Sequence, residues 1–107
     1  MFDFQQVTVD VNDSVQQLGA AQSGKTCRLA ALVGAIDQAG RIWLEDTSGT
    51  VVMGPIPLQA SGDAEPAQFQ YLPDPATPDL FPASQQGRGL QIRCDRHFTG
   101  FAKILYL

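Results

Sequence analysis

Residues 27–54 read CRLAALVGAIDQAGRIWLEDTSGTVVMG, and this stretch decides the fold. Within it, residues 41–46 alternate: Ile42 and Leu44 share one face, which is the period of a half-buried strand. Residues 27–37 are mostly apolar and fit a helix or a strand by periodicity alone. Turn signals at 37–40 and 46–49 separate three β-rich runs. We therefore expect a three-stranded meander in which residues 27–37 are a strand rather than a helix.

The C-terminal part of the chain predicts two more strands after a long loop. All seven prolines lie in residues 55–87, which argues against a central strand or a long helix there. Residues 90–94 alternate, with Leu90, Ile92 and Cys94 directed inward. A turn at Thr99–Gly100 then leads into a strand over 101–106. The total is five strands in a single domain, residues 1–107.

A match to the phosphate-binding loop G-x-x-x-x-G-K-[ST] begins within the lead-in segment, residues 1–25, and ends at Thr26. Gly19 to Thr26 reads GAAQSGKT. That loop requires a buried strand before its first glycine and a long helix after its last residue. Val15 and Leu18 are instead three residues apart, which predicts a short helix ending at Gly19. A small nucleotide binder stays an alternative, supported by the acidic strand end Glu45–Asp46, but we expect the match to be coincidental.

Composition narrows the classes of function. Hydrophobic residues make up 44% of the chain, as in globular proteins, and no apolar run reaches the roughly 20 residues of a membrane span. We therefore expect a soluble intracellular protein, cytoplasmic or nuclear. Cys27, Cys94 and a lone histidine, His97, are too few for a zinc site or a nucleophilic triad. We expect two buried reduced thiols, no cofactor, no metal and no enzymatic activity.

Acidic and basic residues are unevenly distributed along the chain, which has a formal net charge of −4. No lysine or arginine lies between Arg41 and Arg88, whereas six acidic residues do. Residues 88–107 reverse this sign, with four basic residues against Asp95 alone. Such asymmetry is consistent with one basic patch on an acidic molecule, and an acidic molecule also suits a protein partner.

The pattern resembles the OB-fold family. Leu32-x-Gly34-x-Ile36 and Ile42-x-Leu44-x-Asp46-x-Ser48-Gly49-Thr50-Val51 are similar to the first three strands of nucleic-acid-binding OB domains, and the lead-in is similar to that of small OB subunits of single-stranded-DNA-binding complexes. The resemblance implies an all-β, five-stranded Greek-key barrel in which a glycine lets the first strand curve. Here a short helix would precede the barrel, and the 55–87 loop would replace the usual helix between the third and fourth strands.

The resemblance also implies where a ligand lies, across the second and third strands and against two adjoining loops. The candidate nucleic-acid or partner contacts are Arg41, Trp43, Thr50, Val52, Arg88, Arg93, Arg96, Phe98 and Lys103, with Glu45, His97 and residues 38–40 beside them. Trp43 would stack on a base or pack into a protein interface. Arg88, Arg93 and Lys103 would form a phosphate track if they share a strand face.

The function that we expect is therefore a non-enzymatic single-stranded nucleic-acid-binding or accessory subunit of a larger complex. The alternative is an OB module for protein–protein interaction without nucleic-acid contact. The expected partners are single-stranded nucleic acid and a protein, which would be either a different chain or a second copy of this one. The resemblance does not distinguish DNA from RNA or from a protein ligand.

Overall fold

The computed structural model describes residues 4–37, 39–58, 67–74, 76–77 and 80–107. Its strands are β1 (Gln5–Gly19), β2 (Cys27–Ile36), β3 (Gly40–Asp46), β4 (Val51–Leu58), β5 (Ala67–Tyr71) and β6 (Leu90–Tyr106). The predicted all-β class is confirmed. The described part of the chain has no helix long and apolar enough to cross a membrane.

The long strand β6 organises one antiparallel sheet of order β4-β3-β6-β2-β5, with β1 paired to β6 as well. Strand β1 pairs with β6 over nearly its whole length and occupies one edge of it. The other edge of β6 pairs with β3 through residues 90–94 and with β2 through residues 98–106. Strands β2 and β3 thus lie in line along the same edge of β6.

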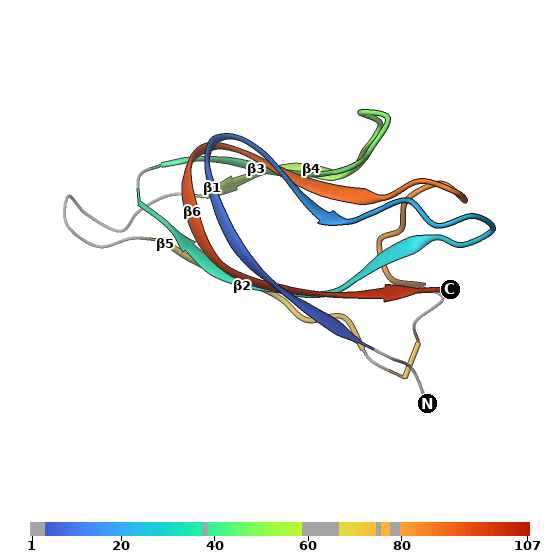
Figure 1. Cartoon of the computed structure of the whole chain (residues 1–107). Helices are drawn as coiled ribbons and strands as arrows, with labels where there is room; N and C mark the ends of the chain where they lie inside the picture. Colours follow the sequence, from blue (N-terminus) through green and yellow to red (C-terminus); the bar gives the residue numbers. More distant parts are fainter. Residues whose placement is uncertain (1–3, 38, 59–66, 75, 78–79) are drawn as a thin grey trace.

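The sheet curls on itself into a half-barrel (Figure 1). We call one half the β3 arm: it contains β3, β4, residues 90–94 of β6 and residues 14–19 of β1. The other half, the β2 arm, contains β2, β5, residues 97–106 of β6 and residues 5–12 of β1. The end of β2, the start of β3 and the bend of β1 lie at the same end of the molecule, where the sheet turns from one arm to the other (Figure 1).

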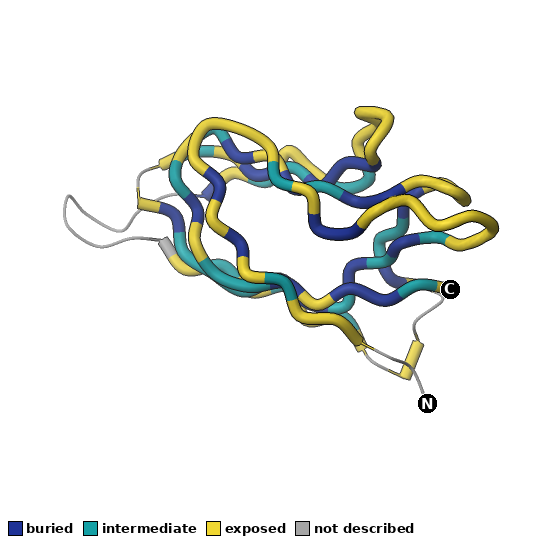
Figure 2. Tube along the Cα trace, in the orientation of Figure 1, coloured by how far each residue is buried: buried dark blue, intermediate teal, exposed yellow. Residues whose placement is uncertain are grey.

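The hydrophobic core lies between the two arms (Figure 2). Leu90, Ile92 and Cys94 point into it from β6, as their alternation predicts, and Ile42 and Leu44 do so from β3. The β2 arm contributes residues that are equally buried: Leu29, Leu32, Ile36, Phe98 and Ile104. Burial of apolar side chains from both arms in one cluster favours the curled sheet over an open one.

Two predictions about how the strands connect and pair are wrong. Strands β2 and β3 do not pair with each other, so the expected meander is absent, although β3 and β4 do form its second hairpin. No turn interrupts the chain at Thr99–Gly100, because β6 continues to Tyr106. The reason for the second error is physical: Gly100 serves a close approach to Gly34 on β2 rather than a turn.

The predicted N-terminal helix is also wrong, since residues 12–18 belong to β1. Val9 and Val11 are buried at period two, as in a strand with one face on the core. The pairing with β6 shifts register between Asn12 and Ser14 and again between Gln17 and Gly19. These irregularities break the alternation and produce the three-residue spacing of Val15 and Leu18 that resembles a helix.

The Pro-rich segment is more ordered than a loop. Strand β4 extends through Pro55 and Pro57 to Leu58, and β5 covers residues 67–71. Both strands lie at ends of the sheet order, where a missing N–H breaks no ladder. Phe69 and Tyr71 pack against the core cluster, so aromatic side chains hold this segment to the barrel. Residues 59–66 lie outside the described residues.

The turn at 46–49 is the predicted one, and it is built on Asp46. Its Oδ1 atom accepts hydrogen bonds from the backbone N of Ser48 (2.9 Å), the backbone N of Thr50 (3.1 Å) and the Ser48 hydroxyl (2.5 Å). Burial by itself raises the pKa of this carboxyl, but these bonds and the nearby charge of Arg88 together lower the pKa below its ordinary value. The carboxylate therefore holds the β3–β4 turn in its ionised form.

Candidate binding surface around Trp43

Trp43 lies on the outer face of the β3 arm, directly opposite Arg93 in the pairing of β3 with β6. The next outward pair on these strands is Glu45 and Gln91. The carboxylate of Glu45 is 3.2 Å from Arg93 Nε and accepts a hydrogen bond of 2.9 Å from Gln91 Nε2. Glu45 is buried under these neighbours, and Arg93 remains about half exposed. The positive charge of Arg93 is therefore balanced within the protein.

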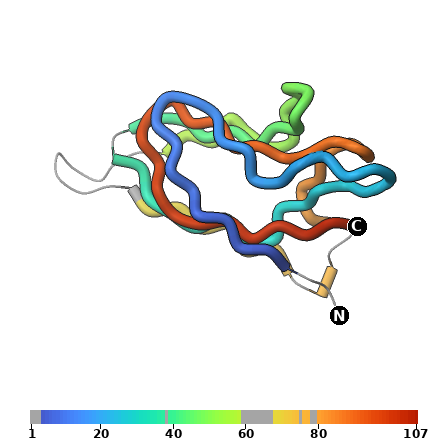
Figure 3. The backbone as a smooth tube through the Cα atoms, viewed as in Figure 1, coloured from blue at the N-terminus to red at the C-terminus, as the bar shows by residue number. Residues whose placement is uncertain are grey.

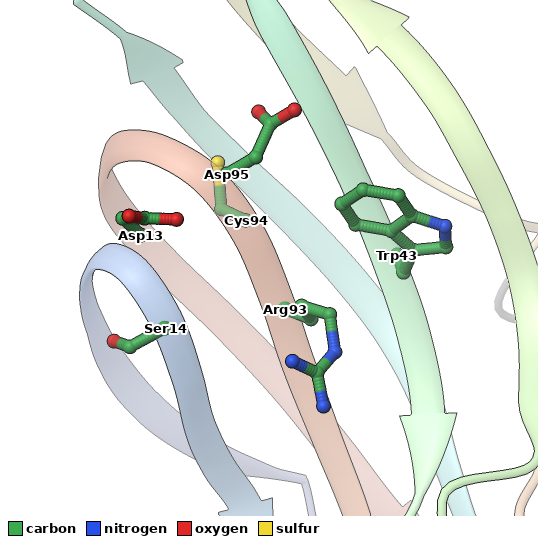
Figure 4. Close-up of a pocket in the computed structure, with 6 residues that line it drawn as sticks. All are labelled: Asp13, Ser14, Trp43, Arg93, Cys94 and Asp95. Carbon is green, nitrogen blue, oxygen red and sulfur yellow. The ribbon is translucent and has the colours of Figure 1, made fainter.

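A cavity of about 200 Å³ opens beside Trp43. Its lining comes from three strands and consists of Asp13, Ser14, Trp43, Arg93, Cys94 and Asp95. Figure 4 shows the indole of Trp43 and the guanidinium of Arg93 on neighbouring strands, with the carboxylates of Asp13 and Asp95 farther along the opening. This cavity therefore has an aromatic wall, a cation and two carboxylates.

The β-bulge of β1 builds one side of the cavity. Asp13 has a positive φ of 47°, a conformation that aspartate tolerates better than most residues, and it falls at the register shift between Asn12 and Ser14. The bulge places residues 13 and 14 beside the strand of Arg93 and Asp95. Sequence reasoning missed both residues, because it predicted a short helix ending at Gly19 in this part of the chain. No local signal reveals them, since their place depends on pairing with a distant strand.

The charges around Trp43 are mixed rather than basic. Asp95 Oδ1 accepts a hydrogen bond of 2.7 Å from the backbone N of Arg41, which fixes that carboxylate at the edge of the cavity. Arg41 and Arg93 supply positive charge, and Asp13, Asp95 and Glu45 supply negative charge, so the acids outnumber the bases. Such a surface does not attract a polyanion by charge alone.

The other predicted contacts do not gather at this site. Phe98 is fully buried in the core, and Val52 packs against the core cluster, so neither residue presents a stacking face at the surface. Thr50 lies exposed between the 46–49 turn and β4, and Arg88 lies in the segment before β6. Lys103 lies on the β2 arm, so the predicted phosphate track is not continuous: roughly 30 Å of strand separates it from Arg93, at about 3.3 Å per residue.

Arg96 and His97 lie near the bend of the sheet. The Nε atom of Arg96 donates to the carbonyl of Ala39 over 3.4 Å. The Nε2 atom of His97 lies 2.7 Å from Asp10 Oδ1, which ties β6 to β1 on the outside of the sheet. Of residues 38–40, Gln38 lies outside the described residues. These contacts give Arg96 and His97 structural roles at the bend, away from Trp43.

The segment that matches the phosphate-binding loop lacks the frame of that loop. Residues 20–26 connect two strands, and β2, not a helix, begins directly after Thr26. The Thr26 backbone N donates to the carbonyl of Leu107 (2.7 Å), and its hydroxyl accepts from Arg28 (3.0 Å). Figure 3 shows this segment beside residues 84–89, where Gly87 N donates to the Lys25 carbonyl (2.8 Å). Its polar groups therefore serve the fold.

The described residues contain no group of three or more His, Cys, Asp or Glu side chains placed to hold a metal ion. When the chain is compared with protein-family models, with curated proteins and with solved structures, none of them matches it.

Proposed function

We propose that this chain is a non-enzymatic protein-interaction module, and that its binding surface is the outer face of the β3 arm centred on Trp43. The observation that carries the proposal is the mixture of positive and negative charge at this face. Arg93 is paired with Glu45, and Asp13 and Asp95 line the cavity next to the indole. A partly buried aromatic residue amid charges of both signs is the composition of a protein interface, in which Trp and Arg are enriched.

The surface offers a partner both shape and hydrogen bonds. An apolar or aromatic side chain of the partner would pack on Trp43 and enter the cavity of about 200 Å³. A donor such as a lysine, an arginine or a backbone N–H would meet Asp13 and Asp95. Val15, which pairs with Arg93 from the β1 side and is 42% exposed, would extend the apolar contact. Complementary charges of this kind contribute mainly to specificity.

Single-stranded nucleic acid is the second candidate ligand. It is favoured by the direct pairing of Trp43 with Arg93, because an indole next to a guanidinium can stack a base and contact its phosphate. Against it stand the three carboxylates of this face and the distance from Lys103. Binding of this kind would depend on stacking more than on a basic track.

The finer fold assignment, to the OB-fold family, is likewise a proposal. It is supported by the curled sheet, by Gly34 at a crowded point of β2 and by the turn at 46–49. The in-line arrangement of β2 and β3 and the continuous β6 depart from the five-stranded Greek-key barrel that this family implies. The proposed function as a single-domain binding module does not depend on this fold assignment.

The experiment that tests the function compares Trp43→Ala with a control variant, Leu107→Ser, which changes an exposed apolar side chain outside the Trp43 face. Each variant is mixed with candidate partner proteins and, separately, with a single-stranded oligonucleotide of about 15 nucleotides at low and high salt. Loss of a protein complex with Trp43→Ala alone supports the proposal. Quenching of Trp43 fluorescence by the oligonucleotide, lost at high salt, would favour the second candidate instead.

A further inference from the structure

A second surface lies on the outer face of the β2 arm and is not used by the proposed function. It is a cavity of about 290 Å³ lined by apolar residues of three segments, among them Phe4, Ala31, Leu72 and Phe81, with Lys103 as the one charged residue that lines it. The register of β2 against β6 shifts between Leu29 and Ala31, and Ala31 lies opposite Lys103. Small alanine side chains on the sheet thus leave a depression beside a lysine.

One wall of this cavity is held firmly in place. Phe81 is only 4% exposed, and the residues after it are hydrogen-bonded to the start of β2. The backbone N of Leu29 donates to the carbonyl of Pro82 (2.8 Å), and the backbone N of Ser84 donates to the carbonyl of Cys27 (2.9 Å). The cavity is therefore part of the folded sheet and its fixed flanking segment.

The two most exposed large hydrophobic side chains among the described residues lie at this cavity or next to a residue that lines it. Leu72, which lines it, is 64% exposed, and Leu80, the neighbour of Phe81, is 78% exposed. Phe4 is 43% exposed on the same lining. Apolar side chains concentrated at one surface, next to a depression that can receive such side chains, are typical of a protein contact.

The charges of this surface are self-complementary. Lys103 is exposed and makes no hydrogen bond or ion pair within the described part of the chain. Asp74, next to the lining residue Pro73, is also exposed, and its Oδ1 atom accepts a hydrogen bond of 2.9 Å from the backbone N of Ala76. One copy of the surface thus carries a protruding leucine, a cavity, an acid and an unpaired lysine.

We propose that a second copy of this chain docks on this surface in a two-fold symmetric dimer. In such an interface each patch meets itself, so every contact occurs twice. Leu80 of each copy enters the cavity of the other, and Asp74 of each copy pairs with Lys103 of the other. The surface around Trp43 lies on the other arm of the sheet, so the dimer does not depend on the function proposed for it.

The test measures self-association by analytical ultracentrifugation over a range of protein concentrations. We expect a reversible monomer–dimer equilibrium that Lys103→Glu and Asp74→Lys each weaken by about tenfold or more, since like charges then face each other twice. The double variant, Lys103→Glu with Asp74→Lys, restores the pairing with reversed sign. Leu80→Asp removes the dimer. The control Lys25→Glu changes an exposed lysine elsewhere and leaves the dimer intact.

Thermal unfolding of each variant shows that it is folded, so a loss of dimer is not a loss of structure. A chain that stays monomeric up to about 1 mM overturns the proposal, because a dimer weaker than that gains only about 4 kcal/mol. A dimer whose affinity is unchanged in both single charge variants overturns it as well. Dimerisation that is lost with Trp43→Ala and kept with Leu80→Asp would place the interface on the other arm.

Discussion

Gly34 and Gly100 face each other across the pairing of β2 with β6, close to the bend of the sheet. A Cβ atom at Gly34 would collide with the carbonyl oxygen of Thr99 and lie 2.5 Å from the ring of Phe98. A Cβ atom at Gly100 would collide with the carbonyl oxygen of Val33 and lie 2.5 Å from the Cα of Gly34. The absence of both side chains lets the two strands approach and leaves room for the buried Phe98.

We expect Gly34→Ala and Gly100→Ala each to lower the free energy of unfolding by about 1–3 kcal/mol, because each overpacks a fixed backbone. Urea denaturation measures this. Gly24→Asn is the matched control, since nothing lies within 4 Å of a Cβ there and asparagine tolerates its positive φ of 74°. The control should change stability by less than about 0.5 kcal/mol. Equal costs at all three positions would mean that crowding is not the reason for these glycines.

How much of the fold was predictable follows from how local each signal is. The alternation of Ile42 with Leu44 and the Asp46 turn are local, and both predictions were confirmed. The path of β1 was not predictable, because its bulge interrupts the alternation and only pairing with β6 shows that it is a strand. The glycine at position 100 resembled a turn, whereas its role depends on Gly34, far away in the sequence.

In the candidate site, too, the residues with a local signal were predicted and those without one were missed. Trp43 and Arg93 were predicted, since the alternation of their strands places them on the outer face. Asp13 and Ser14 were missed, because a bulge on another strand brings them to the cavity. Phe98 was a candidate because the resemblance to the OB-fold family placed it in a loop against the ligand, but β6 continues through that position and its alternation directs the ring into the core.

The two cysteines should be protected from reagents. Both are buried in the core cluster, and burial raises the pKa of Cys27 to about 11, against a smaller lowering by its hydrogen bond with Tyr106, and also raises the pKa of Cys94. Because the thiolate is the reactive form, we expect slow labelling by a thiol reagent at pH 8 and fast labelling in urea. Fast labelling of both thiols in the folded protein would contradict the assigned register.

The Cys27 thiol should make the free energy of unfolding depend on pH in the alkaline range. The pKa of Cys27 is higher in the folded protein than its ordinary value of 9.0. The protonated thiol therefore contributes fully to the free energy of unfolding below pH 9, and this contribution is lost as pH rises towards about 11. We expect Cys27→Ala to flatten the fall of the free energy of unfolding with pH over this window. Part of the fall should remain, since burial also raises the pKa of Tyr106. An unchanged slope would show that Cys27 ionises in the folded state.

Asp46 should make the free energy of unfolding depend on pH in the acidic range. Its pKa is lowered in the folded protein from an ordinary value of 3.8, so its contribution is complete above that pH and is lost as pH falls further. Asp46→Ala removes the acceptor of three hydrogen bonds and should cost about 1–3 kcal/mol at pH 7. The cost should shrink when unfolding is measured below pH 3.8. A cost that is independent of pH would assign the effect to packing alone.

Lys25 should be dispensable, although it occupies the lysine position of the phosphate-binding pattern. Its side chain is exposed, and the loop that carries it has its backbone bonded to residues 86–87 and Leu107. We expect Lys25→Ala to change stability by less than about 0.5 kcal/mol. Calorimetry with ATP and Mg²⁺ should give no heat of binding for either protein. Micromolar binding that disappears in the variant would restore the nucleotide-binding alternative.

The side chain of Gln16 bridges the two arms at the β1 edge of the sheet. Its Oε1 atom accepts a hydrogen bond from the backbone N of Asp10, and its Nε2 atom donates to the carbonyl of Thr8, each over 2.8 Å. In the described chain β1 pairs only with β6, so Thr8 and Asp10 would otherwise present free groups at an edge that could recruit another strand. Gln16 thus closes part of this edge.

We expect Gln16→Ala to lower the free energy of unfolding by about 1 kcal/mol, because two partly solvated hydrogen bonds are lost. Amide hydrogen exchange measured by NMR should show faster exchange of Asp10, since its N–H then meets water, with no change at core positions of β6. Gln17→Ala is the control: that side chain is exposed and lies opposite Gln91 on the outer face. Equal protection of the Asp10 amide in the Gln16 variant would mean that the backbone of β1, without this side chain, holds the two arms together at the edge.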